Sequence, residues 1–135
     1  MAKFAFLVEM KAKPGKEAEV ETFLAKEASL VKGEAGTLTW HAAKIEGETG
    51  IYRVFDTFDT EAAREAHMNG EAGREFVDRA NDLFTEAKIS RLAVVAQKEC
   101  RTSVLRCHSG DDLGRLVRRR RQPPIPWRNI PRKDK

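Results

Sequence analysis

The sequence predicts an α+β domain with the ferredoxin-like order strand–helix–strand–strand–helix–strand (βαββαβ), an antiparallel sheet with helices on one face. Two observations lead to this prediction. Strand-like and helical stretches follow one another in that order over residues 3–98, and a chain of 135 residues has room for one core. We therefore expect one folded domain over residues 1–98.

The first strand is predicted over Lys3–Ala12, because apolar side chains recur there at every second position. Pro14 and Gly15 end this strand, and a helix then runs from Lys16 to a stop at Gly33. The apolar face of this helix also contains one acidic residue. Its members are Ala18, Val20, Phe23, Leu24, Glu27, Leu30 and Val31.

A hairpin is predicted next, with strands Thr37–Glu46 and Ile51–Phe58 joined by a short polar loop that has glycine at both ends. Trp40 and His41 are neighbours in the first of these strands, so their side chains must point to opposite faces of the sheet. We expect one of them to face the helices.

A broken helix and a last strand complete the domain. Asp59 or Thr60 is expected to cap the helix, because either side chain can accept the free amides of the first turn. The helix is interrupted near Gly70, and a second helical part is predicted over Gly70–Ala87. Lys88–Gln97 is the predicted final strand.

Both faces of the predicted sheet carry apolar groups, contributed by Leu7, Ala43, Val54 and residues within Leu92–Ala96. A small sheet with one bare face would expose a sizeable apolar patch. We expect a second copy of the chain to cover that face through a two-fold axis, which gives a homodimer. The alternative is a monomer whose C-terminal tail covers the sheet.

The tail, residues 99–135, differs sharply from the rest of the chain. Residues 1–98 hold 14 basic and 17 acidic residues, a net charge of −3, whereas the tail holds 11 and 4, a net charge of +7. We expect a disordered basic extension. Two alternatives stay open: nucleic-acid binding through the arginine run Arg118–Arg121, and translated sequence foreign to the native protein.

The sequence contains no pattern for a metal or a cofactor, and none is expected. His41, His67 and His108 lack the spacing of metal ligands, and Cys100 with Cys107 and His108 would make only half of a zinc site. No apolar run reaches the ~18 residues of a membrane span. The N-terminus lacks the apolar region of a signal peptide, so a cytoplasmic protein is expected.

Four short motifs in this order resemble the antibiotic biosynthesis monooxygenase (ABM) family: EMKAKPGKEAEVETFL, EAGTL, VFDTFDTEAAREAHMNG and VVAQK. The resemblance covers about residues 3–98. It implies a ferredoxin-like fold that dimerises into an α+β barrel, and oxidation of an aromatic substrate by molecular oxygen without metal, flavin or haem.

The resemblance therefore predicts a cofactor-independent monooxygenase acting on a small planar phenol, hydroquinone or related aromatic. Relatives with this fold also degrade haem, isomerise small metabolites or have no assigned activity, and fold transfers between relatives more safely than reaction. The alternative is a non-catalytic ligand-binding or stress-associated dimer of the same fold.

His67 is the candidate general base, because the resemblance places a histidine at this helix end and a neutral imidazole can take a proton near pH 7. The alternative is a structural histidine that hydrogen-bonds the loop at Gly70. Trp40 is a candidate pocket wall that stacks on the substrate, or else a core residue. His41 is expected to be a plain strand residue.

Four further residues are candidates for substrate binding. Arg53 could hold a phenolate or pair with a carboxylate at the sheet edge. Asn69 could orient the substrate or simply end the helix. Phe6 and Phe55 are expected in the core, with the pocket as a second location.

Overall fold

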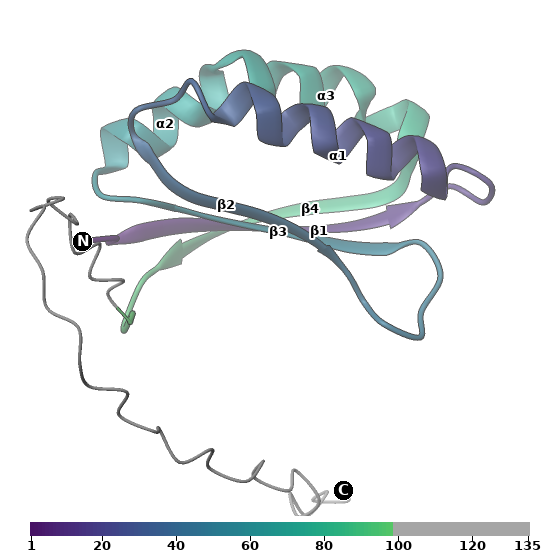
Figure 1. Cartoon of the computed structure of the whole chain (residues 1–135), viewed down its shortest axis with the longest axis horizontal. Coiled ribbons are helices and arrows are strands. Elements are labelled where there is room, and N and C mark those ends of the chain that lie inside the picture. The colour runs from purple at the N-terminus through teal and green to yellow at the C-terminus, as the bar shows by residue number, and fades with distance from the viewer. Residues whose placement is uncertain (99–135) are drawn as a thin grey trace, which may run out of the picture. The chain divides into compact units, whose positions relative to one another are not determined.

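The computed structural model describes residues 1–98, and the predictions for residues 99–135 lie outside that part. It contains a four-stranded antiparallel sheet in the order β2-β3-β1-β4, with three helices on one face (Figure 1). The predicted α+β ferredoxin-like class is confirmed. The elements are β1 Phe4–Ala12, α1 Glu17–Val31, β2 Thr37–Lys44, β3 Ile51–Phe58, α2 Glu61–Asn69, α3 Glu71–Leu83 and β4 Phe84–Ala93.

The boundary between the last helix and the last strand was predicted wrongly. The helix ends at Leu83 rather than Ala87, and β4 begins at Phe84 rather than Lys88. The reason is a long-range pairing: Phe84 is buried and pairs with Ala12 across an irregularity in the β1–β4 ladder. Sheet pairing and burial here outweigh the local helical period.

Other local predictions are confirmed, except for the end of β2. The strand Ile51–Phe58 has the predicted bounds, and β2 ends two residues early, at Lys44. The Thr60 hydroxyl accepts the backbone N–H of Ala63 at 3.0 Å, so Thr60 is the N-cap of α2. The helix is interrupted at Gly70 as expected, and Asn69 is its last residue.

The core lies between the helices and the sheet. Alternation along each strand sends one set of side chains toward the helices, and the largest fully buried residues include Phe6, Met10, Phe58 and Leu83. Arg64 of α2 is also buried there, and its guanidinium lies over the rings of Phe4 and Phe6. Its long side chain thus packs α2 onto β1.

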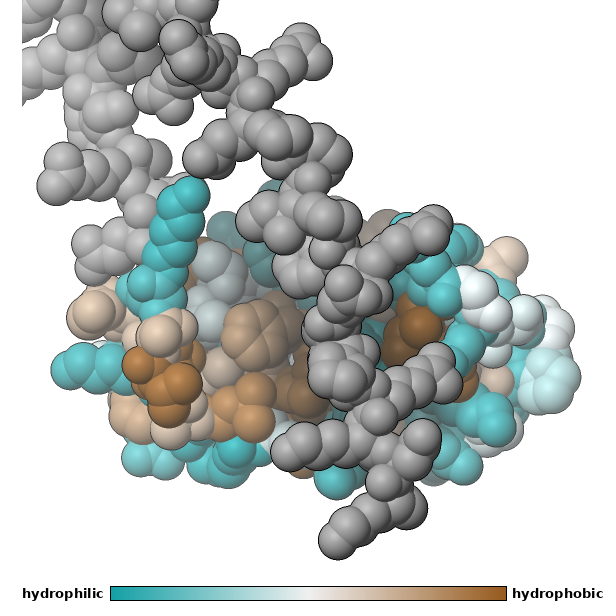
Figure 2. Space-filling view, turned by 90° about the horizontal axis from the view of Figure 1, so that it is seen from below, coloured by the Kyte–Doolittle hydropathy of each residue, from teal (hydrophilic) through white to brown (hydrophobic). Residues whose placement is uncertain are grey.

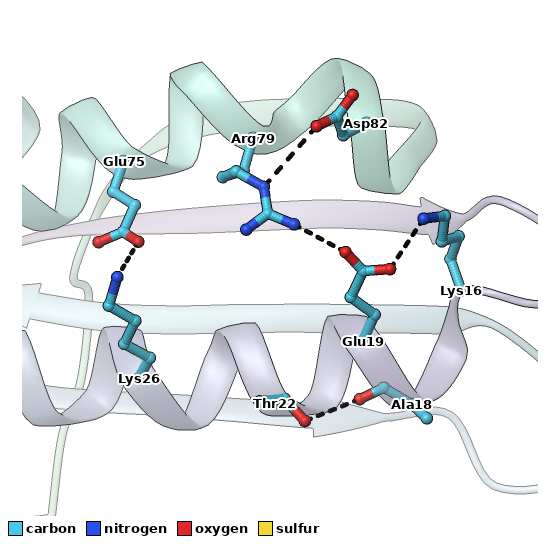
Figure 3. Close-up of polar contacts among 8 residues, drawn as sticks. All are labelled: Lys16, Ala18, Glu19, Thr22, Lys26, Glu75, Arg79 and Asp82. Atoms are coloured by element: carbon cyan, nitrogen blue, oxygen red, sulfur yellow. Dashed lines mark hydrogen bonds and ion pairs between the residues drawn. The ribbon is translucent and has the colours of Figure 1, made fainter.

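Ion pairs join α1 to α3 on the outer side of the helical layer (Figure 3). Lys26 pairs with Glu75, and Arg79 contacts Glu19 at 2.8 Å. Exposed pairs of this kind contribute only a few tenths of a kcal/mol each, up to about 1 kcal/mol. They therefore add little to the stability of the fold.

The other face of the sheet carries none of the three helices of residues 1–98 (Figure 1). Leu7 pairs with Phe55 across β1 and β3, so their side chains share this face, where Phe55 is 40% exposed. Leu92 of β4 pairs with Ala5 and belongs to the same face. Figure 2 shows apolar surface gathered on this face beside charged and polar groups.

Gly73 allows the close approach of α2 and α3. A Cβ at this position would lie 2.2 Å from the carbonyl oxygen of Met68, a distance that no methyl group tolerates. The joint between the two helices therefore requires glycine, and it sets how the last turn of α2 sits over the sheet.

We predict that Gly73→Ala lowers the free energy of unfolding by about 1–3 kcal/mol, the usual cost of overpacking, because backbone atoms must move to admit the methyl group. Urea unfolding measures this loss. Gly33→Ala is the matched control, since its new Cβ meets only the Leu30 carbonyl oxygen at 3.6 Å. Equal stability of the two variants would contradict the close approach.

Candidate functional site

His67 is held between two carboxylates in the last turn of α2. Its Nδ1 lies 2.6 Å from Oε2 of Glu34, and its Nε2 lies 3.2 Å from Oδ2 of Asp56. The His67 side chain is 10% exposed and that of Asp56 only 2%. Asp56, His67 and Glu34 thus form one group of interacting ionisable side chains between the sheet and the helices.

Each carboxylate is held in place by its own element. Asp56 lies on the helix-facing side of β3, where its Oδ1 accepts the backbone N–H of Phe6 at 3.1 Å. Glu34 lies in the loop between α1 and β2, and its Oε2 accepts the Thr37 hydroxyl at 2.7 Å. A strand, a loop and a helix therefore converge on one imidazole.

Aromatic rings enclose the histidine. The Phe58 ring lies 5.3 Å from the imidazole, and the Phe6 ring lies 6.5 Å from it. These apolar neighbours exclude water and strengthen the electrostatic interaction with the carboxylates.

The charge of His67 follows from this geometry. Burial lowers the pKa of the imidazole, but the hydrogen bonds and negative charges of Asp56 and Glu34 outweigh burial and leave that pKa raised. Each ring nitrogen faces a carboxylate oxygen, so this environment favours the protonated ring, in which both nitrogens donate. His67 is caged by two carboxylates, and neither ring nitrogen is free to act alone as a base.

A cavity of about 40 Å³ adjoins Asp56 and His67 between the sheet and the helices. Its walls are mostly apolar, with three ionisable groups among them: Phe6, Val8, Leu24, Glu27, Trp40, Val54, Asp56, His67, Met68, Ala72, Gly73, Phe76 and Ile89. The volume admits a few water molecules, whereas sites for small ligands usually span about 300 Å³ or more. An aromatic ligand requires wall side chains to move.

Glu27 is the least compensated group in the cavity wall. Glu27 is 4% exposed, and its Oε1 has no hydrogen-bond partner within residues 1–98. Burial, aided by the negative charge of Glu75, raises the pKa of this carboxyl from 4.5 to about 7. At neutral pH Glu27 therefore exists in comparable amounts as acid and as carboxylate.

A larger groove runs outside the cavity, between α1 and β2. It measures about 480 Å³, and Trp40 and Leu24 line both the groove and the cavity. The two spaces therefore adjoin at these two side chains.

The structure brings together three of the six predicted site residues. Phe6, Trp40 and His67 line one cavity. Arg53 and Phe55 belong to the opposite sheet face, because alternation along β3 separates them from Asp56. Arg53 pairs with Glu9 there, at 3.5 Å.

The other two positions singled out in the sequence lie away from the cavity. Asn69 is exposed at the end of α2. His41 is exposed on β2, so of the adjacent pair it is Trp40 that faces the helices.

The sequence reasoning missed Glu27, Glu34 and Asp56 as site residues. The sequence pattern could have indicated two of them, because each is an acidic residue at a position that the pattern reserves for apolar side chains. Glu27 lies on the apolar face of α1, and Asp56 is at a position of β3 whose side chain points into the core. No such pattern indicates Glu34. It lies in a loop, and only the folded chain brings it to His67.

Within residues 1–98, no group of three or more histidine, cysteine, aspartate or glutamate side chains could hold a metal ion. No helix there is long and apolar enough to cross a membrane.

The family of the chain is shown by comparison with known proteins. The model of the antibiotic biosynthesis monooxygenase family matches residues 4–79. The chain belongs to this family, whose members are commonly dimeric. No curated protein matches the sequence.

Solved structures agree with this assignment. A protein of unknown function from Nitrosomonas europaea, NE2512, is 36% identical, with a TM-score of 0.69 over 74% of this chain and 96% of that one. A proposed antibiotic biosynthesis monooxygenase from Caulobacter crescentus is 22% identical, with a TM-score of 0.63 over 70% and 92%. PA3566 from Pseudomonas aeruginosa is also 22% identical, with a TM-score of 0.64 over 71% and 97%. The last two show the fold alone.

The raised pKa of Glu27 predicts how stability depends on pH. Between pH 4.5 and about 7 the folded chain keeps a proton that the unfolded chain releases, so the free energy of unfolding falls as pH rises. The whole decrease is about 3 kcal/mol. His67, with a raised pKa, adds a further decrease above pH 6.5.

Glu27→Gln should abolish the decrease in the free energy of unfolding between pH 4.5 and about 7 and leave the decrease above pH 6.5 that His67 causes. Urea unfolding between pH 5 and pH 8 measures both, with Glu19→Gln as a control on the exposed side of the same helix. Wild-type and Glu27→Gln curves that run parallel over this range would contradict a titration of Glu27 near pH 7.

Proposed function

We propose that the protein is a small oxygenase that oxidises a planar phenol, hydroquinone or anthrone with molecular oxygen and without a bound cofactor. The observation that carries the proposal is the cavity in which an apolar aromatic wall meets Glu27, Asp56 and His67. Membership of the family supports the same class of reaction. We expect the protein to act in the cytoplasm.

The chemistry that we propose needs only the substrate and oxygen. An anthrone loses a proton from its CH₂ group, and the resulting anion gives its electrons to oxygen. In the balanced reaction, R₂CH₂ and O₂ become R₂C=O and H₂O, so the substrate supplies all the electrons. The protein deprotonates the substrate, orients it and excludes water.

His67 takes part in this scheme as a charged group within a chain. Because both ring nitrogens donate to carboxylates, we propose that it balances the charge of the substrate anion. It also exchanges protons with Glu34, whose side chain is 23% exposed. In this scheme the Asp56–His67–Glu34 group balances charge and relays protons, in place of the single-base role predicted for His67 from the sequence.

Substrate entry requires the cavity to widen. We propose that Trp40 turns toward the groove between α1 and β2, which joins the two spaces and places its indole against the substrate ring. Trp40 then serves as both gate and stacking partner.

We further propose that the helix-free sheet face forms a homodimer interface. Leu7, Phe55 and Leu92 supply apolar surface there, and a second sheet would bury it. In this arrangement Arg53 and Phe55 contribute to the interface rather than to the cavity of their own chain.

His67→Ala should lower oxygen uptake by roughly 10²–10⁴-fold, the usual loss for a proton-transfer group, because the carboxylate chain loses its cation. An oxygen electrode with a panel of hydroquinones and anthrones measures this, at a temperature where the variant is folded. Asp78→Asn, on the exposed side of α3, is the control. Activity retained by His67→Ala removes the histidine from the mechanism, and a loss that only follows the melting temperature makes it structural.

Sedimentation at micromolar concentration should find the full chain as a dimer, and Phe55→Glu should shift it to monomer, because buried charges in the interface lack partners. Circular dichroism checks that the variant is folded. A wild-type chain that is monomeric under these conditions rejects the face-to-face arrangement.

A further inference from the structure

The structure contains a buried carboxyl oxygen that lacks a partner, in the wall of the proposed substrate cavity. Buried polar atoms in proteins are almost always hydrogen-bonded, and leaving one unpaired costs about 1–3 kcal/mol. Glu27 Oε1 is such an atom within residues 1–98. Glu27 lies on α1 and lines the cavity, and no donor among residues 1–98 forms a hydrogen bond with this oxygen.

We propose that Glu27 is the group that first takes the acidic proton of the bound substrate. The inference rests on the proposed function for the class of substrate. The choice of residue rests on the structure. Glu27 is buried, lines the cavity and has a carboxyl oxygen without a hydrogen-bond partner among residues 1–98.

The other ionisable groups of the cavity are already engaged. His67 uses both ring nitrogens on carboxylates, and Asp56 binds both the imidazole and the Phe6 amide. A substrate hydroxyl or acidic CH₂ group that reaches the cavity thus finds an acceptor that has no partner among residues 1–98, Oε1 of Glu27. A hydroxyl would also supply the hydrogen bond that this oxygen lacks.

Charges on every neighbouring element set the proton affinity of Glu27. Glu75 on α3 and Glu34 in the loop before β2 raise its pKa, while Lys26 on α1 and His67 on α2 lower it. Asp56 on β3 lines the same cavity and is paired with His67. With burial, these groups bring the pKa to about 7, the range that suits a base working at neutral pH.

The proposed step transfers one proton and no electrons. The C–H bond of an anthrone, or the O–H bond of a phenol, breaks and leaves its electron pair on the substrate. A new O–H bond forms at Glu27 Oε1, so the negative charge moves from the carboxylate to the substrate. The imidazolium of His67 remains in the cavity wall to balance that charge.

Anaerobic binding of dithranol, an anthrone, tests this step without the oxygen reaction. The full-length protein at pH 7.5 should show the visible absorption of the bound dithranol anion. Glu27→Gln should bind dithranol but lose most of that absorption, while the exposed matched control Glu19→Gln should keep it. Equal anion absorption in Glu27→Gln and wild type overturns the inference, and so does bound dithranol that stays neutral in wild type.

Admitting air adds the kinetic test. Glu27→Gln should lower oxygen uptake by roughly 10²–10⁴-fold. Glu75→Gln should stay active and shift the acid limb of the pH–rate profile to lower pH, because removal of the Glu75 charge lowers the pKa of Glu27. An unchanged acid limb in Glu75→Gln counts against Glu27, and this variant keeps the inference testable if Glu27→Gln fails to fold.

The outcomes separate the two proposals. An anion that forms only when Glu27 is present, with no oxygen uptake afterwards, supports the inference and rejects the oxygenase. Oxygen uptake that survives Glu27→Gln supports the oxygenase and rejects the inference. Failure of dithranol to bind at all counts against both.

Discussion

The interaction on which the rest of the site depends is the double contact of His67 with Asp56 and Glu34. It ties α2 to β3 and to the loop that enters β2, and it holds a cation inside an apolar layer. Removing one partner of a buried charged pair typically costs about 3–5 kcal/mol, because the other charge remains without compensation. The contact therefore fixes local structure and local charge together.

This arrangement divides the work among the ionisable groups of the cavity. The imidazole is saturated with hydrogen bonds, so it supplies positive charge and a route for protons. Oε1 of Glu27 has no hydrogen-bond partner within residues 1–98, and the pKa of this carboxyl is about 7. Glu27 can therefore gain or lose a proton near neutral pH at little cost in free energy. In the mechanism that we propose, the histidine predicted as base from the sequence leaves that role to Glu27, because the carboxylates around the imidazole favour its protonated form.

The alternation of the strands separates two surfaces with different roles. On β3, Asp56 points to the helices and the cavity, while Phe55 points to the helix-free face. Side chains adjacent in sequence thus serve a candidate active site and a proposed dimer interface. A one-residue slip of the strand would exchange the two sets and destroy both surfaces.

The sequence by itself determined the order of elements, the bounds of β3 and a helix cap at Asp59 or Thr60, because these depend on local periodicity and short-range hydrogen bonds. Its motifs also identified the family. It also indicated His67 and Trp40. Only the tertiary structure decided that Phe84 begins a strand, that Arg53 and Phe55 lie away from the cavity, and that His67 is caged. The separation in sequence is the physical reason: Glu34 and Asp56 lie 33 and 11 residues before His67, and no local pattern reports contacts that exist only after the sheet and helices pack.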